Sequence, residues 1–217
     1  MTTHLFLGAT EPHGLPYPVT LGGSVTIMGG AGCGKTTLAR EIAAEARRAG
    51  ADVTAVLGTE CGDPDRYQGV AHEVTTDTTG ALRTALQVMT ARETDLRHGR
   101  QWSTPLVLVL DDAHHNPHWR GEPAAPAALG ARVDAITQWG AATGVTVVYV
   151  NARPRLTVEP THAALCRITR AWARPLVGDQ PVPSTLGRWL FTRPHAAGVM
   201  GVPSEVTIPA PAQRADQ

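Results

Sequence analysis

The sequence of 217 residues is poor in lysine, in phenylalanine and tyrosine, and in net charge. It holds one lysine, Lys35, so 18 of its 19 basic residues are arginines. These 19 are balanced by 19 acidic residues, and the formal charge is zero with histidine neutral. The balance excludes the uniformly basic surface of a protein that coats nucleic acid, although it allows a local basic patch. A single lysine in a chain that otherwise uses arginine indicates a specific task for Lys35.

Cysteines and long apolar runs are also few. The three cysteines, Cys33, Cys61 and Cys166, form no close pair. This excludes a metal knuckle or a Cys-x-x-Cys redox motif and indicates a reduced, intracellular setting. The chain begins without the basic start and apolar core of a signal peptide, and no run reaches the roughly 20 apolar residues of a membrane span. We therefore expect a cytoplasmic protein with no direct membrane insertion.

The chain does contain a regular alternation of apolar runs and helical patterns. An uninterrupted aliphatic run, such as LVLVL at 106–110, is typical of a strand that is covered on both faces. Strands that alternate with helices predict an α/β fold, with a mostly parallel central sheet flanked by helices. We expect strands at 24–28, 53–57, 70–74, 106–110 and 145–150, helices at 35–49, 82–96 and 129–139, and a loop at 113–128.

The last part of the chain has a different pattern. After an expected strand at 165–172, prolines and glycines separate short β elements, including 189–191 and 206–208. The length and a hydrophobic content of 42% suit one compact domain. We expect that domain to span 1–208 and the tail 209–217 to be disordered.

A glycine-rich segment follows the first expected strand. Residues 29–36 read GGAGCGKT and match G-x-x-x-x-G-K-[ST] in full, between a buried strand and an amphipathic helix. The backbone N–H groups of such a loop and the start of its helix bind phosphates, and Lys35 reaches the β- and γ-phosphates. This task explains the single lysine, because the guanidinium of arginine is too large and planar for it. The expected cofactors are therefore ATP and Mg²⁺, bound by Gly29, Gly30, Ala31, Gly32, Cys33, Gly34, Lys35, Thr36 and Thr37.

Two aspartates follow the LVLVL strand. Asp111 stands where a Walker B aspartate holds the hydration shell of Mg²⁺, so Thr36 and Asp111 are the candidate metal residues. Asp112 stands where many P-loop ATPases carry a glutamate that polarises the attacking water. Because aspartate is one methylene shorter, we expect either a longer contact to the water or slow hydrolysis.

Two further polar residues follow the strand at 145–150. Asn151 lies at its C-terminal end, where ligands of open sheets bind, and is a candidate sensor of the γ-phosphate or the attacking water. Arg153 follows, just before a proline. Plainer alternatives remain: a polar turn for Asn151 and Arg153, a strand-end turn for Asp111 and Asp112, and a glycine-rich turn that carries GKT by chance.

With these residues in place, the chain resembles the FtsK–HerA family of P-loop ATPases from about Leu7 to Ile208. The stretch VTTDTTGALRTALQVMTARETDL at 74–96 is similar to the family's Val-Thr-Asp segment and the helix after it. LVLVLDD falls where the family has its Walker B strand and Asp-Glu. ITQWGAATGVTVVYVNARP at 136–154 is similar to a helix and a strand closing in Ala-Thr-Gln-Arg-Pro. The segments ALCRITRAW and LGRWLF match later elements in the same order.

The resemblance implies a RecA-like (ASCE) P-loop NTPase core, in which strand 145–150 lies between the P-loop strand and strand 106–110. Asn151 replaces the Thr of the Ala-Thr-Gln-Arg-Pro motif, Ala152 replaces its Gln, and Arg153 keeps its Arg. Arg167 and Arg170 are the candidates for an arginine finger that reaches the γ-phosphate bound by a neighbouring subunit.

The resemblance also implies a function. Family members are typically hexameric rings that pump double-stranded DNA, so we expect an ATP-hydrolysing motor that translocates double-stranded DNA for viral genome packaging or for transfer of a mobile element. A docking protein at a portal, vertex or membrane would anchor it, in the host cytoplasm or on the virion if the chain is viral. The alternative is a nucleotide-binding switch or assembly protein with weak or no hydrolysis. A small-molecule P-loop kinase is less favoured, because no arginine-rich lid is apparent.

Overall fold

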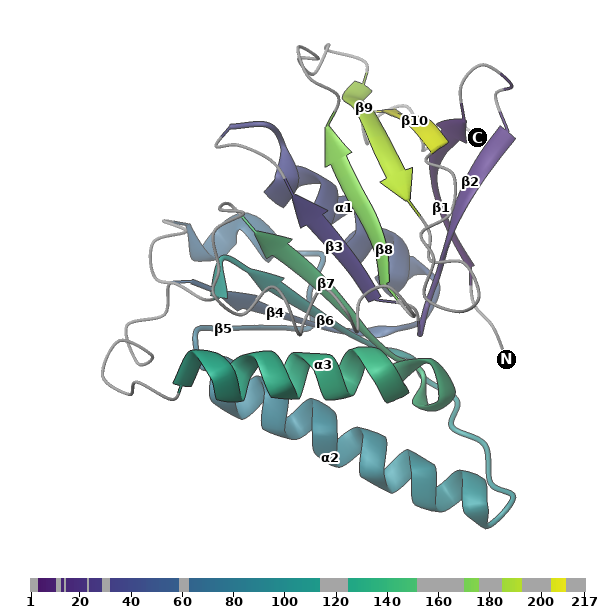
Figure 1. Cartoon of the computed structure of the whole chain (residues 1–217), viewed down its shortest axis with the longest axis vertical. Helices are drawn as coiled ribbons and strands as arrows, with labels where there is room; N and C mark the ends of the chain where they lie inside the picture. Colours follow the sequence, from purple (N-terminus) through teal and green to yellow (C-terminus); the bar gives the residue numbers. More distant parts are fainter. Residues whose placement is uncertain are drawn as a thin grey trace.

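In the computed structural model, the described residues are 4–10, 13, 15–22, 24–28, 32–58, 63–113, 125–151, 170–175, 185–192 and 204–209. Their ten strands form one sheet in the order β2-β1-β10-β9-β8-β3-β7-β6-β4-β5 (Figure 1). The strands are β1 (His4–Thr10), β2 (Leu15–Thr20), β3 (Ser24–Met28), β4 (Asp52–Leu57), β5 (Glu73–Thr75), β6 (Leu106–Asp111), β7 (Val145–Asn151), β8 (Arg170–Pro175), β9 (Thr185–Thr192) and β10 (Ser204–Pro209). The helices are α1 (Lys35–Arg48), η1 (Pro64–Tyr67, a 3₁₀ turn), α2 (Thr78–Arg97) and α3 (Ala125–Thr143).

The sheet has a parallel part and an antiparallel part. Strands β8, β3, β7, β6, β4 and β5 run parallel to one another, whereas β9, β10, β1 and β2 continue the sheet in antiparallel pairs. The predicted α/β class with a mostly parallel core is confirmed. The predicted position of strand 145–150 is also confirmed, because β7 pairs with both β3 and β6.

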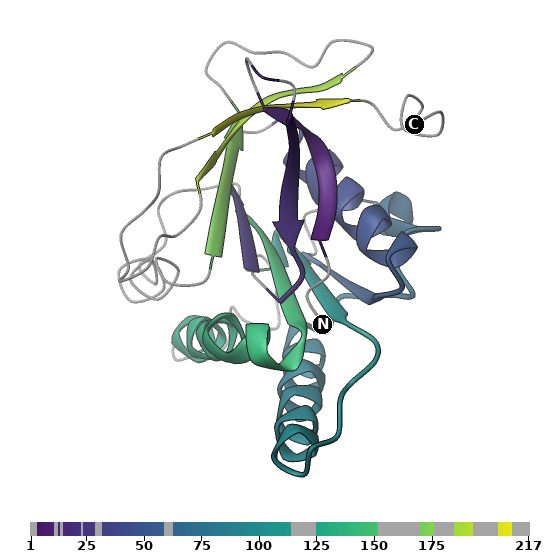
Figure 2. The ribbon, with the colours of Figure 1, turned by 90° about the vertical axis from the view of Figure 1, so that its right-hand side faces the viewer.

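Helices cover both faces of the parallel part, which explains why its strands are continuously aliphatic (Figure 2). Along β6, Val107 and Val109 face the cluster that contains α1, while Leu108 and Leu110 face the cluster that contains α2 and α3. All four side chains are at most 1% exposed. At about 1.5–3 kcal/mol for each fully buried aliphatic side chain, β6 is a main contributor to the stability of the sheet.

The antiparallel strands complete the α1 face of the core. Leu5 and Leu7 of β1, Trp189 of β9, and Val206 and Ile208 of β10 all belong to the cluster that contains α1. The hairpin of β1 and β2 was not predicted, because glycine and prolines interrupt its alternation of apolar and polar residues. The described strands β9 and β10, from the last third of the chain, therefore belong to the same core as the helix that follows the P-loop.

Several predicted boundaries were wrong. The predicted loop at 113–128 ends earlier, because α3 begins at Ala125 instead of Leu129. Pro126 lies in the first turn of α3, where a missing N–H costs no helical hydrogen bond, and the neighbouring alanines favour helix. Three strands also lie later or extend further than expected: β5 is at 73–75, β8 continues to 175, and β10 includes Pro209, the first residue of the expected tail.

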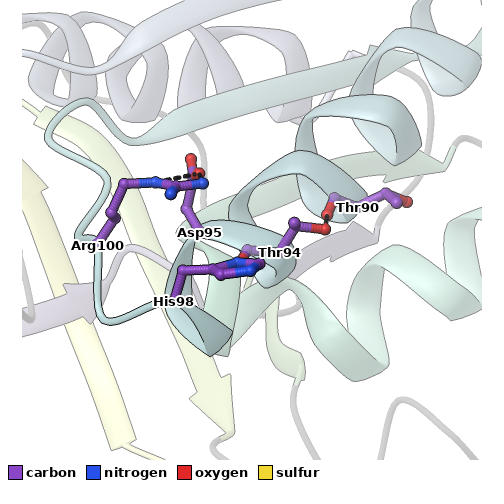
Figure 3. A network of polar contacts seen from close by, with 5 residues as sticks. All are labelled: Thr90, Thr94, Asp95, His98 and Arg100. Atoms are coloured by element: carbon purple, nitrogen blue, oxygen red, sulfur yellow. Dashed lines mark hydrogen bonds and ion pairs between the residues drawn. The ribbon is translucent and has the colours of Figure 1, made fainter.

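The C-terminal end of α2 is closed by local polar contacts, shown in Figure 3. The Thr94 hydroxyl donates to the carbonyl of Thr90 at 2.9 Å, and Nδ1 of His98 lies 2.7 Å from the carbonyl of Thr94. Arg100 folds back and forms an ion pair with Asp95 at 2.6 Å. Because these groups are solvent-exposed, they end the helix without adding much stability. Among the described residues, no helix combines the length and apolar composition needed to cross a bilayer.

Candidate functional site

The predicted site residues gather at the carboxyl edge of the parallel strands. Met28 of β3 pairs with Asn151 of β7, and Asp111 of β6 pairs with Val150 of β7 and with Leu57 of β4. Parallel strands in register end at the same edge, so residues far apart in sequence meet there. This arrangement brings Asp111 beside the loop that follows β3.

That loop leads into α1, which begins without a side-chain cap. Gly34, the N-cap residue, has φ +88°, a left-handed conformation that glycine adopts without strain. It provides no side-chain cap, and the first turn of α1 carries no acidic residue. By contrast, the Asp77 side chain caps α2 by accepting from the N–H of Gly80 at 2.9 Å. The start of α1 is therefore suited to bind an anion.

Of the side chains of the motif, Lys35 is buried in the P-loop and Thr36 contacts Asp111. Lys35 is only 7% exposed, and its Nζ lies 4.0 Å from Sγ of Cys33. The Thr36 hydroxyl donates to Oδ1 of Asp111 at 3.3 Å, across 75 positions of sequence. A hydroxyl and a carboxylate at this distance supply the hard oxygen donors that Mg²⁺ prefers, so these two residues fit the metal that the motif implies.

Tyr67 is a site residue that the sequence reasoning missed. It is fully buried, and its hydroxyl donates to Oδ2 of Asp111 at 3.0 Å. The ring comes from η1, which begins with Asp63 as N-cap and Pro64 at its first position. An Asp-Pro pair after a strand is a recognised start signal for a helical turn, so the turn was predictable, although its contact with Asp111 was not.

Burial dominates the electrostatics of Asp111. The carboxyl is inaccessible to solvent, and this desolvation raises its pKa. The hydrogen bonds from Tyr67 and Thr36 act in the opposite direction because they stabilise the charged form. The neighbouring charge of Asp112 raises the pKa further, and that of Arg66 lowers it. The site thus holds a carboxylate whose negative charge is only partly compensated by the protein.

Asp112 has an unusual backbone conformation. Its φ of +50° is the only positive value among the described non-glycine residues. The turn is held by β4, because the N–H of Gly58 donates to the carbonyl of Asp111 at 2.9 Å. Positive φ is uncommon for a residue with a side chain, although Asp tolerates it better than most. The conformation directs the chain away from β6 immediately after the first aspartate.

The structure describes the remaining predicted residues to different extents. Gly32 and Thr37 are exposed, and Cys33 is half-buried and is not in a disulfide. The backbone places Asn151 beside Met28, at the end of the P-loop strand β3. It places Arg170 beside Ser24, at the start of β3 and thus at the opposite end of the parallel strands from the P-loop. The roles of Asn151 and Arg170 stay predictions. Gly29, Gly30, Ala31, Ala152, Arg153 and Arg167 lie outside the described residues.

A protein-family comparison agrees with this geometry. The family model described as an AAA domain matches residues 20–153, which include β3, the P-loop, α1 and β6. The matched segment covers more than half of the chain and contains Lys35, Thr36, Asp111 and Asp112. No curated protein sequence gives a significant match.

Solved structures with the same fold include a conjugation coupling protein, a type VII secretion ATPase and the cytoplasmic domain of EssC. The pCW3 conjugation coupling protein TcpA, a monomer with ATPγS, has a TM-score of 0.67 at 18% identity over 95% of this chain and 64% of its own. The cytoplasmic domain of the Thermomonospora curvata type VII secretion ATPase EccC has a TM-score of 0.62 at 14% identity over 94% of this chain and 28% of its own. The cytoplasmic domain of EssC has a TM-score of 0.61 at 17% identity over 95% of this chain and 42% of its own.

The chain thus spans less than two thirds of the length of each of these proteins. At these identities the similarity establishes the fold. Together with the family match, it confirms the predicted resemblance to the FtsK–HerA superfamily of P-loop ATPases.

Proposed function

This chain belongs to the AAA domain family and is a P-loop ATPase; from that premise, we propose that it hydrolyses ATP with Mg²⁺ and uses the free energy to move double-stranded DNA through a homo-hexameric ring. The observation that carries the proposal is the contact between Thr36 and Asp111, next to Lys35, at the start of a helix without a side-chain cap. An anion at that position receives backbone N–H groups, the positive end of α1 and a lysine ammonium together.

Each residue then has a defined task. Lys35 and the N–H groups of the loop bind the β- and γ-phosphates and orient them. Thr36 and Asp111 would hold Mg²⁺, which when bound supplies positive charge against the phosphate oxygens. Asp112 positions the attacking water, and Asn151, at the end of β7, contacts the γ-phosphate or that water. Arg153 keeps the arginine of the Ala-Thr-Gln-Arg-Pro motif beside Asn151. Arg167 or Arg170 supplies the positive charge that a neighbouring subunit presents to the same nucleotide.

The DNA substrate is the finer part of the proposal. One of the similar structures is a conjugation coupling protein, which favours transfer of a mobile element over viral genome packaging. The proposal includes a ring that is anchored by a separate docking partner. Because the chain has no net charge, its contact with DNA must be a local cluster of arginines, and it must weaken as salt concentration rises.

A second candidate, a nucleotide-dependent assembly switch, is favoured by one observation. Asp112 is shorter than the usual glutamate and stands at a positive φ. A carboxylate that falls short of the attacking water leaves binding intact and slows hydrolysis. In this alternative, ATP holds an interface together and turnover is negligible.

The test is ATP hydrolysis by the full chain with and without linear double-stranded DNA, at low and moderate salt. Lys35→Ala serves as the blank, and Lys35→Arg keeps the charge while removing the slender ammonium. We expect DNA to stimulate wild-type hydrolysis, with less stimulation at higher salt, and both variants to be inactive. Hydrolysis that no DNA stimulates would refute the translocase.

Asp112→Glu separates the two candidates. If the switch is correct, wild type binds ATP with negligible turnover and the glutamate variant gains activity. If the motor is correct, wild type already turns over rapidly, and the variant changes the rate little.

A further inference from the structure

A tyrosine outside the P-loop motif donates a hydrogen bond to Asp111. Tyr67 reaches it from a segment 44 positions earlier in the chain, through the turn that follows β4. Asp63 caps that turn by accepting from the N–H of Asp65 at 2.9 Å, and Pro64 fixes its first backbone angle. The position of the phenol is therefore set by local backbone geometry and not by a flexible loop.

The surroundings of the ring leave it one orientation. Tyr67 is fully buried in the same apolar cluster as Ile27, Leu57 and Val109, which are residues of β3, β4 and β6. Its backbone carbonyl accepts from the N–H of Ala71 at 2.9 Å, which closes the turn behind it. A ring packed in this way cannot rotate its hydroxyl to another partner without opening the core.

The two oxygens of Asp111 therefore have different, fixed donors. Oδ2 accepts from the Tyr67 hydroxyl at 3.0 Å, and Oδ1 accepts from the Thr36 hydroxyl at 3.3 Å. Two donors on opposite oxygens define the plane of the carboxylate. Thr36 is itself a candidate metal residue, whereas Tyr67 belongs to no expected ligand set and contacts the carboxylate from the buried side.

We propose that Tyr67 is a positioning residue that orients the Asp111 carboxylate for the Mg²⁺–nucleotide complex. The proposal rests on the proposed nucleotide function, and it adds a residue that the P-loop and aspartate motifs do not contain. Partners of this kind fix the direction of a metal-binding group, and their loss commonly weakens metal affinity by about 10–100-fold. A purely structural tyrosine would instead fill volume, and phenylalanine would replace it with no effect on the metal.

The experiment measures ADP binding by calorimetry at a series of MgCl₂ concentrations. Tyr67→Phe removes only the hydroxyl. We expect the gain in ADP affinity that Mg²⁺ produces to be about tenfold smaller than in wild type, with the ADP affinity in the absence of Mg²⁺ unchanged. Tyr149→Phe is the matched control, because Tyr149 lies on the opposite face of the sheet, in the cluster of α2 and α3. It should behave as wild type. We further expect excess Mg²⁺ to restore ATP hydrolysis by Tyr67→Phe.

Two outcomes separate this inference from the function on which it rests. Wild type that binds no nucleotide at any Mg²⁺ concentration overturns both. Wild type that binds ADP in an Mg²⁺-dependent manner, with Tyr67→Phe showing the same dependence, overturns the role of Tyr67 alone.

A measurement on the wild-type chain removes any reliance on the folding of the variant. The sequence has only three tyrosines, so ring-labelled tyrosine gives three resolvable NMR signals. Tyr17→Phe and Tyr149→Phe assign the Tyr67 signal by elimination. We expect that signal to shift when MgCl₂ is added to the ADP-bound protein, and Asp111→Asn to abolish the shift. A Tyr67 signal that does not respond to Mg²⁺ contradicts the proposal.

Discussion

Gly58, at the end of β4, is in backbone contact with Asp112. A Cβ added to Gly58 would lie 2.0 Å from the carbonyl oxygen of Asp112 and 2.7 Å from its carbonyl carbon. The N–H of Gly58 also donates to the carbonyl of Asp111 at 2.9 Å. The end of one strand thus fixes the turn that carries both acidic residues of the site, and any side chain at position 58 must displace it.

Gly58→Ala should therefore impair both stability and turnover. We expect a loss of about 1–3 kcal/mol in the free energy of unfolding, because the added methyl group meets backbone that cannot yield. We also expect turnover at saturating ATP to fall about tenfold or more, since displacement of the turn moves Asp112 away from the attacking water. Urea unfolding and steady-state hydrolysis measure the two effects.

Gly69→Ala is the control for backbone strain alone. Gly69 has a positive φ, +76°, which Gly58 does not, and nothing lies within 4 Å of its added Cβ. Gly69→Ala should lower the free energy of unfolding by about 1 kcal/mol and leave turnover at the wild-type level. Equal losses in the two variants would show that the contact between Gly58 and Asp112 does not constrain the site.

Asp111→Asn should stabilise the nucleotide-free protein near neutral pH while abolishing hydrolysis. Burial raises the pKa of Asp111, so the folded state holds the proton more strongly than the unfolded state does. The stability that the protonated Asp111 carboxyl contributes is therefore fully present below the pKa of aspartate in the unfolded chain, about 4. It is lost as pH rises through the pKa of Asp111 in the folded protein. A neutral amide at position 111 avoids that loss.

Thermal unfolding of wild type and of Asp111→Asn across pH tests whether the substitution stabilises the folded protein. The melting temperature of Asp111→Asn should exceed that of wild type at pH 7, and the difference should shrink toward pH 4. Asp95→Asn, at an exposed ion pair, should change stability by less than about 1 kcal/mol. A neutral-pH melting temperature below wild type would mean that the charge of Asp111 supports the fold.

Arg92 joins α2 to the ends of two neighbouring elements. Its guanidinium donates to the carbonyls of Thr104 at 2.6 Å, Thr143 at 2.8 Å and Gly144 at 3.3 Å, and it lies 5.3 Å from the centre of the Trp102 ring. Arg92→Met leaves these carbonyls without their charged donor, so we expect a loss of about 2 kcal/mol on urea unfolding. Because lysine lacks the planar guanidinium with its several N–H donors, Arg92→Lys should retain only part of the stability that Arg92→Met loses.

Arg97→Met is the matched comparison for Arg92. Arg97 lies five residues later on the same helix, and its ion pair with Glu93 is exposed to solvent. The free energy of unfolding of Arg97→Met should lie within about 0.5 kcal/mol of the wild-type value. Similar losses at positions 92 and 97 would contradict a special role for the carbonyl contacts.

Trp189 should report nucleotide binding through its fluorescence. It is 1% exposed, and its Cζ2 lies 3.9 Å from the position of a Cβ on Gly34, the cap of α1. A phosphate bound at the start of α1 changes the electric field at the indole, so ADP with Mg²⁺ should alter the emission. Trp189→Phe should lose this change, and Trp139→Phe should keep it, because Trp139 is 60% exposed on α3. A response that survives in Trp189→Phe would place the reporter elsewhere.

Periodicity and motif spacing were enough to predict the parallel core. The run at 106–110 is aliphatic at every position, and the run at 145–150 is apolar except for Thr146, because both strands are buried on both faces. The P-loop was predictable because its motif couples a strand, a loop and a helix within a short stretch. Helix α3 was placed too late, because Pro126 looks like a helix breaker in sequence although it is harmless in a first turn.

The sequence by itself determined the chemistry of the site: a lysine and a threonine after glycines, and two aspartates after a buried strand. Only the tertiary structure decided which groups surround Asp111, because the hydroxyl of Tyr67, the backbone of Gly58 and the carboxylate meet through packing between segments distant in the chain. Local patterns report the neighbours along a helix or strand, whereas contacts across a sheet depend on register and on the path of loops. The same reason hid the hairpin of β1 and β2, whose place in the sheet is set by its pairing with β10.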